Sequence, residues 1–342
     1  MKHCKLAFLG FGHVNQALAS LLLKKQAEIK VKDKLSFTVT GIATGSHGSA
    51  VDTTGIDLEK ALRSVESGDS LNPLSTPSNP VKETIEFIRC CEADVLFEAI
   101  PVNYTNGQPA LDHIRTALQS GIHVVSANKG PVVFGYNELT ELAGSKGLKY
   151  RFESAVMDGV PIFSMFREIL PVVEIKGFQG ILNSTTNLIL TQMENGSTFE
   201  EALRYAQSIG VAESDPAGDI DGWDSAVKVS ALATVLMDAP TTPQMVKRSG
   251  IKELTLKDIK IAKKEGKRWK LICEAVRLGD QVECRVAPQK VGIDSQFYPI
   301  EGTSSIIQFE TEILGKLTIL EEDSDLYTTA YGMLADFLNV VK

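Results

Sequence analysis

One stretch of the chain concentrates side chains that can bind a cation and transfer a proton. Within a predicted loop and the start of a helix it holds Glu213, Asp215, Asp219, Asp221, Asp224 and Lys228. Carboxylates can hold a substrate ammonium group. A lysine among them can exchange a proton with a hydroxyl, which is worth roughly 10²–10⁴ in rate. The stretch therefore predicts acid–base chemistry on a substrate that carries an ammonium group.

The pattern inside this stretch favours a partly buried site. Asp224 and Lys228 stand at positions i and i+4, so they share one helical face and can pair. Most acidic clusters are solvated surface, and an exposed loop that caps a helix is the alternative interpretation. The apolar neighbours Ile220, Trp223 and Val227 argue against it. A calcium loop does not fit, because the glycine comes too early and the closing glutamate is missing.

A second lysine follows a predicted strand. The run Ala127-Asn128-Lys129 follows the predicted strand His123–Ser126, and ligands of open α/β sheets bind beyond the carboxyl ends of the strands. A lysine can act as a base only where burial or a nearby cation lowers its pKa. Lys129 is therefore either a ligand-contacting residue or an ordinary residue of a surface loop.

A glycine-rich turn predicts a dinucleotide site. The run Gly10-Phe11-Gly12-His13-Val14-Asn15 lies between a buried strand, Lys5–Leu9, and a helix expected over about 13–25. Gly10 permits a tight turn, and Gly12 lets the backbone approach a pyrophosphate that the helix N-terminus attracts. Asn15 replaces the third small residue, which predicts looser packing of the helix on the strand. A tight turn without a ligand is the alternative.

The end of the second predicted strand bears on which dinucleotide is used. Strand Phe37–Ala43 is followed by Thr44-Gly45-Ser46-His47-Gly48, without the acidic residue that would bind a ribose 2′-hydroxyl. Small hydroxyls and a histidine can tolerate a 2′-phosphate. Both NADP and NAD therefore stay candidates.

The elements that must position these residues change character along the chain. Strand and helix signals alternate over roughly the first 130 residues, which predicts a parallel sheet covered on both faces. Past residue 150 the pattern predicts a separate mixed sheet. The other elements expected are a loop at 69–80, helices at 81–88, 109–119, 198–210, 222–237 and 328–341, and strands at 94–97, 281–286 and 306–309.

Composition excludes several classes of partner. The chain has 342 residues, of which 43% are hydrophobic, and this suits two domains. A net charge of −8 without a basic stripe argues against nucleic acid and anionic membranes. No apolar stretch reaches the roughly 20 residues of a membrane span. The five cysteines lack metal-binding spacing, so we expect reduced thiols in a cytoplasmic protein.

Several motifs together resemble the homoserine dehydrogenase family, in the short form without a C-terminal regulatory domain. The resemblance extends over nearly the whole chain. The motifs that carry it are Pro109–Arg115, Gly121–Pro131, Glu153–Pro161, Gly180–Asn187 and Glu213–Lys228.

The resemblance implies a role for each matched residue. Lys228 and Lys129 would flank the reacting hydroxyl and transfer its proton. Substrate would be bound by Glu213, Asp219, Asp224, Asp215 and Thr185; the cofactor, NADP or NAD, by Gly10, Gly12, His13, Val14, Asn128 and Lys129; and a structural sodium or potassium ion by the backbone carbonyls of Glu153, Val156, Asp158 and Val160.

The family's fold is α/β, with a Rossmann-like dinucleotide-binding domain and an inserted α/β domain with a mixed sheet. We expect the first at 1–135, the substrate-binding and dimerisation domain at 136–310, and a C-terminal segment at 311–342 that returns to the first domain. The reaction implied interconverts L-homoserine and L-aspartate 4-semialdehyde, a step of threonine and methionine biosynthesis. A homodimer is expected.

Three positions depart from the family pattern. Asn15 and Ser184 each replace a glycine, and Glu321-Glu322-Asp323-Ser324-Asp325 replaces a glycine-rich loop ahead of Thr329-Ala330. The acidic loop predicts weaker dinucleotide binding. Two alternatives follow: a dehydrogenase for a related amino-acid aldehyde, or a homologue that binds an amino acid with altered or lost cofactor use.

Overall fold

The computed structural model describes residues 1–76, 81 and 83–342, which form two compact units. Unit 1 comprises Met1–Pro161 and Asp325–Lys342, and unit 2 comprises Ile162–Ser324. The predicted loop at 69–80 and helix at 81–88 lie partly outside the described residues. Within them, helix α3 begins at Thr84 and ends at Cys90.

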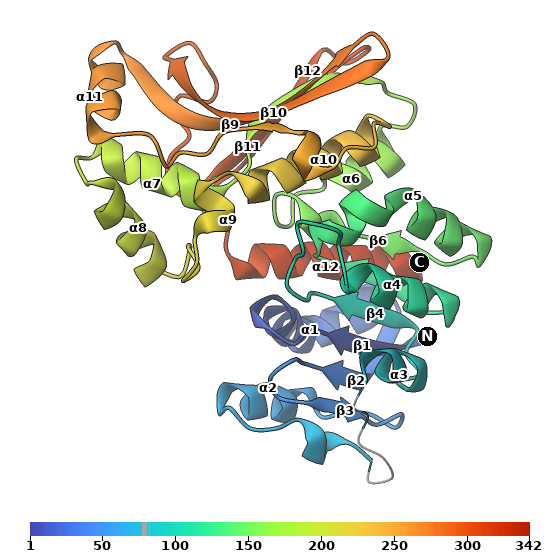
Figure 1. Cartoon of the computed structure of the whole chain (residues 1–342). Coiled ribbons are helices and arrows are strands. Elements are labelled where there is room, and N and C mark those ends of the chain that lie inside the picture. The colour runs from blue at the N-terminus through green and yellow to red at the C-terminus, as the bar shows by residue number, and fades with distance from the viewer. Residues whose placement is uncertain (77–80, 82) are drawn as a thin grey trace. The chain divides into compact units, whose positions relative to one another are not determined.

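Unit 1 is built on a six-stranded sheet with the order β3-β2-β1-β4-β5-β6. All neighbouring strands are parallel except β3, which is antiparallel to β2. The predicted parallel sheet is therefore confirmed (Figure 1). The strands are β1 (Lys2–Leu9), β2 (Leu35–Ala43), β3 (Ser49–Val51), β4 (Val95–Glu98), β5 (His123–Ser126) and β6 (Tyr150–Arg151).

Helices cover the sheet of unit 1. In one group, α1 (His13–Lys32) packs against α12 (Leu326–Val341). In the other, α4 (Ala110–Gln119) packs against both α3 and α5 (Lys129–Ser145). The short α2 (Leu58–Glu66) contacts α1. Helix α1 continues beyond the predicted end at Lys25, because the residues that follow include Gln, Ala, Glu and Lys, which favour helix.

The C-terminal helix completes the core of unit 1. Phe337 of α12 packs edge-on against Phe97 of β4, with ring centroids 5.6 Å apart. Phe97 stacks in turn on Phe8 of β1 at 5.2 Å. The last segment of the chain thus supplies part of the hydrophobic core of the domain that begins at the N-terminus.

Unit 2 is built on a second six-stranded sheet with the order β12-β11-β7-β9-β10-β8. Its neighbouring strands are antiparallel except β8, which is parallel to β10, so the predicted mixed sheet is confirmed. The strands are β7 (Ile175–Ile181), β8 (Lys247–Arg248), β9 (Lys267–Leu278), β10 (Gln281–Gly292), β11 (Ser305–Thr311) and β12 (Lys316–Glu321). β10 is twice as long as predicted, because it pairs with β9 along its full length.

The helices of unit 2 carry the carboxylate cluster. They are α6 (Ile162–Ser164), α7 (Ser184–Glu194), α8 (Phe199–Ser208), α9 (Ala217–Ile220), α10 (Trp223–Leu236) and α11 (Leu256–Lys264). α10 packs on β9 and β10, and α7 packs on β9 (Figure 1). The predicted capping box at Thr198 is confirmed, because its hydroxyl accepts from the amide of Glu201 and the Glu201 carboxylate accepts from the amide of Thr198.

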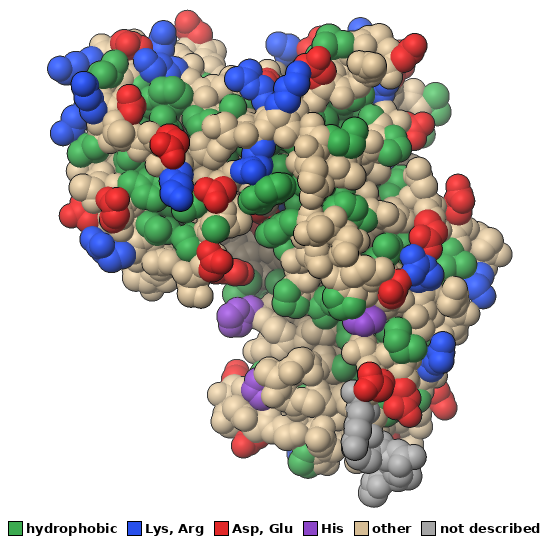
Figure 2. Space-filling model, in the orientation of Figure 1, with side chains coloured by type: hydrophobic (Ala, Val, Ile, Leu, Met, Phe, Trp, Pro, Cys, Tyr) green, Lys and Arg blue, Asp and Glu red, His purple; other side chains and the backbone are tan. Residues whose placement is uncertain are grey.

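Among the described residues, the visible surface carries charged side chains of both signs without a basic stripe, as the composition predicts (Figure 2). Basic and acidic side chains are interspersed on the visible face (Figure 2). Within the described residues, no helix is long and apolar enough to cross a membrane. All five cysteines are free thiols, and four of them are buried.

Candidate active site

Helix α10 brings Asp224 and Lys228 together. The helix begins after Gly222, whose φ of 80° is in the left-handed region that glycine adopts readily. Asp224 lies in the first turn and Lys228 one turn later, so Lys228 Nζ lies 3.2 Å from Asp224 Oδ2. The predicted pairing is confirmed. Asp224 is only 8% exposed, so the loop and helix form a partly buried polar site.

Asn183 joins this pair to a second carboxylate. Its Nδ2 donates to Asp219 Oδ1 over 2.7 Å and to Asp224 Oδ2 over 3.0 Å. Its Oδ1 accepts from the amide of Thr186, which caps the N-terminus of α7. Sequence reasoning missed both this role and helix α7; the available signal was that asparagine is a favourable N-cap residue.

The cluster has a net negative charge when its groups are ionised. Two carboxylates, Asp219 and Asp224, face one ammonium group, that of Lys228. Burial, followed by the charge of Asp224, raises the pKa of Asp219, while hydrogen bonds from Asn183 and Thr185 lower it less. A further cation would reduce the repulsion between the carboxylates, so the cluster favours binding of an ammonium group.

Strand β7 and helix α7 hold the other side of the cluster. Lys228 Nζ donates to the carbonyl of Leu182, directly after β7, over 2.6 Å. Thr185, in the first turn of α7, donates from its hydroxyl to the carbonyl of Val211 over 3.1 Å. Thr185 is thus placed beside both Asp219 and the loop that carries the acidic residues.

Two predicted substrate residues lie on an exposed part of that loop. The carbonyl of Glu213 accepts from Gln207 Nε2, and its side chain is exposed. Asp215 is also exposed, and its Oδ1 accepts from the amide of Ala217 at the start of α9. Their roles in substrate binding stay predictions.

The predicted phosphate-binding turn of unit 1 has room for a ligand. Gly10 has a φ of 81°, and a Cβ there would lie 2.7 Å from the carbonyl oxygen of Ala99, so only glycine fits. A Cβ on Gly12 would meet nothing within 4 Å. Gly12 caps α1 without a side-chain hydrogen bond, and the first turn has no acidic residue. These features fit the pyrophosphate of NAD or NADP.

Asn15 corrects one prediction about this turn. The side chain is fully buried, and Nδ2 donates to the carbonyl of Gly10 over 2.7 Å. Rather than loosening the packing, the asparagine links α1 to the turn with a hydrogen bond that glycine could not make.

The predicted sheet-edge lysine lies where a helix begins. Lys129 is the first residue of α5, and Asn128 is its N-cap. Asn128 is buried, and its Oδ1 accepts from the amide of Gly130 over 3.0 Å. Both residues lie just beyond β5, after Ala127, as the sequence predicts.

The predicted cation segment forms a tight turn. Met157 and Asp158 have φ values of 51° and 49°, and the amide of Val160 donates to the carbonyl of Met157. Asp158 Oδ1 accepts from the hydroxyl of Thr329 over 2.7 Å. The described residues contain no cluster of three metal-ligating side chains, so a cation here would depend on the backbone carbonyls that include those of Glu153 and Val156.

The acidic loop at 321–325 is shorter than predicted. Glu321 belongs to β12, and Asp325 caps α12 by accepting from the amides of Tyr327 and Thr328. The closing helix therefore begins at Leu326, earlier than the predicted Thr328. Only 322–324 are irregular, because Asp is a favourable N-cap.

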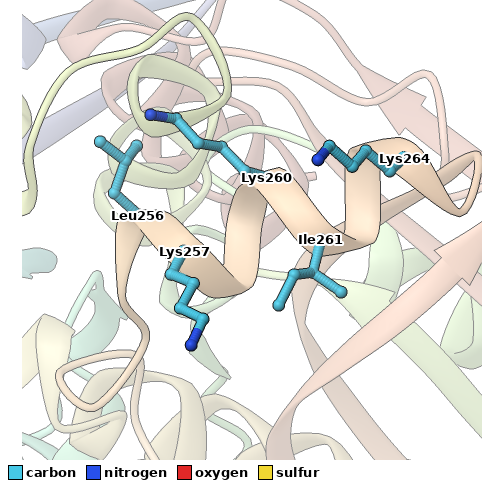
Figure 3. Close-up of a pocket in the computed structure, with 5 residues that line it drawn as sticks. All are labelled: Leu256, Lys257, Lys260, Ile261 and Lys264. Carbon is cyan, nitrogen blue, oxygen red and sulfur yellow. The ribbon is translucent and has the colours of Figure 1, made fainter.

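A shallow hollow elsewhere on unit 2 has different chemistry. It lies on α11 (Figure 3), and its lining residues are Leu256, Lys257, Lys260, Ile261 and Lys264. None of them is a predicted site residue, and none is acidic. The hollow therefore shares no residue with the carboxylate cluster and is lined by basic and apolar side chains.

Comparisons with known proteins identify the family. A family model described as homoserine dehydrogenase matches residues 161–338. An NAD(+)-dependent homoserine dehydrogenase from Pseudomonas canavaninivorans is 35% identical over 99% of this chain and 97% of the relative. A homoserine dehydrogenase from Methanocaldococcus jannaschii is 35% identical over 98% of each chain.

A solved structure agrees. The crystal structure of an Archaeoglobus fulgidus protein assigned as a homoserine dehydrogenase is 31% identical, with a TM-score of 0.86 over 98% of this chain and 99% of that one. The resemblance seen in the sequence motifs is thereby confirmed, and so is the α/β fold with a Rossmann-like domain. The chain belongs to the homoserine dehydrogenase family.

Proposed function

We propose that the protein interconverts L-homoserine and L-aspartate 4-semialdehyde, using NAD or NADP. The observation that carries this proposal is the cluster of Asn183, Asp219, Asp224 and Lys228, in which carboxylates that favour an ammonium group surround a lysine. Family membership supports a dehydrogenase acting on an amino acid. It favours this reaction over a homologue that only binds its ligand.

Asp219 and Asp224 bind and orient the substrate. L-Homoserine carries an ammonium group, and the cluster's net negative charge attracts it. A charge-assisted hydrogen bond in a closed site is worth about 1.5–3 kcal/mol. Asn183 keeps both carboxylates at fixed positions, so little ordering is needed when the substrate binds.

Lys228 and Lys129 handle the proton of the reacting hydroxyl. Oxidation of an alcohol to an aldehyde removes a proton from oxygen and a hydride from carbon. A neutral lysine takes up the proton, and the corresponding ammonium returns it in the reverse direction. Asp224 and the Leu182 carbonyl hold Lys228 Nζ in place for this transfer.

The nicotinamide cofactor, when bound, accepts or donates the hydride. The residues that would hold it are Gly10, Gly12, His13 and Val14 at the start of α1, with Asn128 and Lys129 after β5. Thr44 and Ser46, which follow β2, leave both NAD and NADP acceptable. The acidic segment before α12 weakens this binding.

Three finer assignments belong to the same proposal. The carbonyls of Glu153, Val156, Asp158 and Val160 hold a sodium or potassium ion. The chain works as a homodimer through 136–310, which is supported by the exposed apolar residues Val276 and Leu278 on β9. It is cytoplasmic, since its free thiols suit a reducing compartment.

A substrate panel tests the proposal. Nicotinamide absorbance is followed with L-homoserine, D-homoserine and 4-hydroxybutyrate, which keeps the hydroxyl but lacks the ammonium group. We expect turnover of L-homoserine and loss of at least tenfold in kcat/KM for 4-hydroxybutyrate. Glu213→Gln and Asp219→Asn should weaken substrate binding more than cofactor binding. Equal turnover of L-homoserine and 4-hydroxybutyrate, or failure to bind either dinucleotide, would contradict the proposal.

A further inference from the structure

Glu98 is a fully buried carboxylate that the proposed mechanism does not use. It is the last residue of β4 and pairs in register with Ser126, the last residue of β5. Its exposed fraction is 0%. Burial raises the pKa of Glu98, while hydrogen bonds from neighbouring donors lower it less. A buried carboxylate is costly unless donors surround it, so its partners define what it does.

Three donors surround the Glu98 carboxylate. Ser126 Oγ donates to Oε2 over 2.5 Å. The amide of Ile100 donates to Oε1 over 3.0 Å, and Asn128 Nδ2 donates to the same oxygen over 3.2 Å. Both carboxylate oxygens therefore act as acceptors, and no partner requires a proton from Glu98. The three donors together fix the orientation of the Glu98 side chain.

These contacts continue to the start of helix α5. Ser126 Oγ, which donates to Glu98, accepts from the amide of Asn128 over 3.0 Å. Asn128 Oδ1 accepts from the amide of Gly130 over 3.0 Å. Lys129 lies between these two residues, so the backbone on both sides of it is fixed by groups that Glu98 anchors.

Two close contacts leave this segment little freedom. Asn128 Nδ2 also donates to the carbonyl of Ile100 over 3.2 Å. A Cβ on Gly130 would lie 3.1 Å from the Cα of Gly107, so the start of α5 packs tightly against a neighbouring loop. A shift in the position of Asn128 would therefore also shift Lys129, because the neighbouring backbone has little room to adjust.

We infer that Glu98 is a positioning residue that acts through Ser126 and Asn128 to fix Lys129 at the carboxyl edge of the sheet. The inference rests on the proposed role of Lys129 in proton transfer. A misplacement of about 1 Å by a residue remote from the chemistry can reduce the rate by about 10²-fold. Glu98 thus sets kcat without contacting the substrate.

Glu98→Gln tests the inference, because an amide has a single acceptor oxygen and cannot accept at the positions of both Oε1 and Oε2. We expect kcat to fall by about 10–100-fold, with less than a threefold change in KM for L-homoserine. Ser126→Ala is the milder second variant, and the double variant should be little worse than Glu98→Gln. Glu138→Gln is the matched control, because Glu138 is an exposed residue of α5 that pairs with Arg115.

A double-mutant cycle with Lys129→Met separates positioning from general stability. If Glu98 acts through Lys129, Glu98→Gln should change kcat less than twofold when Lys129 is already Met. A full additional loss in that background, or wild-type kcat in both Glu98→Gln and Ser126→Ala while Lys129→Met is impaired, would overturn the inference.

Hydrogen exchange keeps the inference testable if Lys129 has no role in catalysis. Wild-type kcat in Lys129→Met would refute the proposed proton transfer by Lys129. In either case, Glu98→Gln should speed amide exchange in peptide 126–134 by about tenfold and leave peptides from α10 unchanged. Unchanged exchange in peptide 126–134 would show that Glu98 does not hold this segment.

Discussion

Lys228 Nζ and Asp224 Oδ2 lie 3.2 Å apart on consecutive turns of α10, and the same ammonium donates to the carbonyl of Leu182. The lysine is therefore held by its own helix and by the end of β7. A group fixed on two sides is suited to proton transfer, because its position does not depend on the substrate.

Replacing Lys228 by Met should remove proton transfer while preserving the shape of the side chain. We expect kcat for L-homoserine to fall at least about 10²-fold, with a smaller change in KM. The steady-state rate in both directions is the measurement. Lys260→Met on the exposed face of α11 is the control. Near-wild-type turnover in Lys228→Met would remove the lysine from the mechanism.

Asn183 permits a sharper experiment, because its amide nitrogen binds the two carboxylates while its amide oxygen caps α7. Asn183→Ser keeps an oxygen that can cap α7 but loses the amide that donates to Asp219 and Asp224. We expect KM for L-homoserine to rise about tenfold or more, with little loss of stability. Asn183→Ala should also lower the free energy of unfolding by a further ~1 kcal/mol. Unchanged KM in both variants would show that the bridge is dispensable.

The buried Asp219 carboxyl predicts that the stability of the fold depends on pH. Burial and the charge of Asp224 raise its pKa above the ordinary 3.8, so the folded protein binds this proton more tightly than the unfolded chain. The associated stability is present below the unfolded pKa and is lost as pH rises through the folded pKa.

We therefore expect Asp219→Asn to have a higher Tm than wild type at neutral pH, with the difference shrinking as pH falls toward the unfolded pKa. The measurement is Tm across this pH range for both proteins. A difference independent of pH would mean that the Asp219 carboxyl does not titrate abnormally.

The segment before α12 predicts weak dinucleotide binding. Each carboxylate at 6–8 Å from a phosphate costs only about 0.5–0.7 kcal/mol before salt screening. Replacing 322–324 with Gly/Ala while keeping Asp325 should tighten NAD and NADP binding by up to about tenfold, as measured by calorimetry.

Asp325→Ala is the contrasting variant, because it removes the α12 cap and should lower stability by ~1 kcal/mol without improving binding. Low-micromolar binding by the wild type, with no gain from the replacement, would show that the segment is harmless.

Lys270 predicts a second pH effect. It is fully buried on β9, and its Nζ donates to Asn187 Oδ1 over 3.1 Å and to the carbonyl of Ile300. Burial, followed by the nearby Arg268, lowers the pKa of Lys270 from 10.5 to about 8. Burying the charged lysine lowers the free energy of unfolding by its full amount at pH values below the folded pKa. This cost decreases as pH rises and is gone once pH exceeds the unfolded pKa.

Denaturation of wild type and Lys270→Met should expose this cost. Relative to the variant, wild type should gain roughly 3 kcal/mol in free energy of unfolding as pH rises from about 8 to about 10.5. The comparison cancels the titration of groups common to both proteins. A constant difference between them over this range would show that Lys270 has an ordinary pKa.

Local patterns in the sequence predicted part of the fold but not α5, α7, β7 and β9. Alternating strands and helices indicated the parallel sheet of unit 1, and the i, i+4 spacing indicated the Asp224–Lys228 pair. Asn183 lies 36 residues from Asp219 and 41 from Asp224, so its bridge depends on how the tertiary fold places the start of α7 beside α9 and the first turn of α10. No local pattern encodes such a contact.

Buried charged groups were also beyond the sequence. Lys270 is a lysine in a strand, which by itself indicates an exposed position. Its burial depends on Asn187, 83 residues away in the chain. Glu98 likewise stands at the end of an apolar strand, and its donors come from the neighbouring strand, at Ser126, and from the start of α5, at Asn128.

The return of α12 to unit 1 has a consequence for synthesis on the ribosome. Phe337 packs against Phe97, so the strands of unit 1 cannot complete their hydrophobic core until α12, which is translated later, has emerged. Unit 2 is one continuous segment, Ile162–Ser324, and all its strands are available earlier. The nascent chain therefore completes its middle before its beginning, and the unfinished N-terminal sheet must avoid aggregation during that interval.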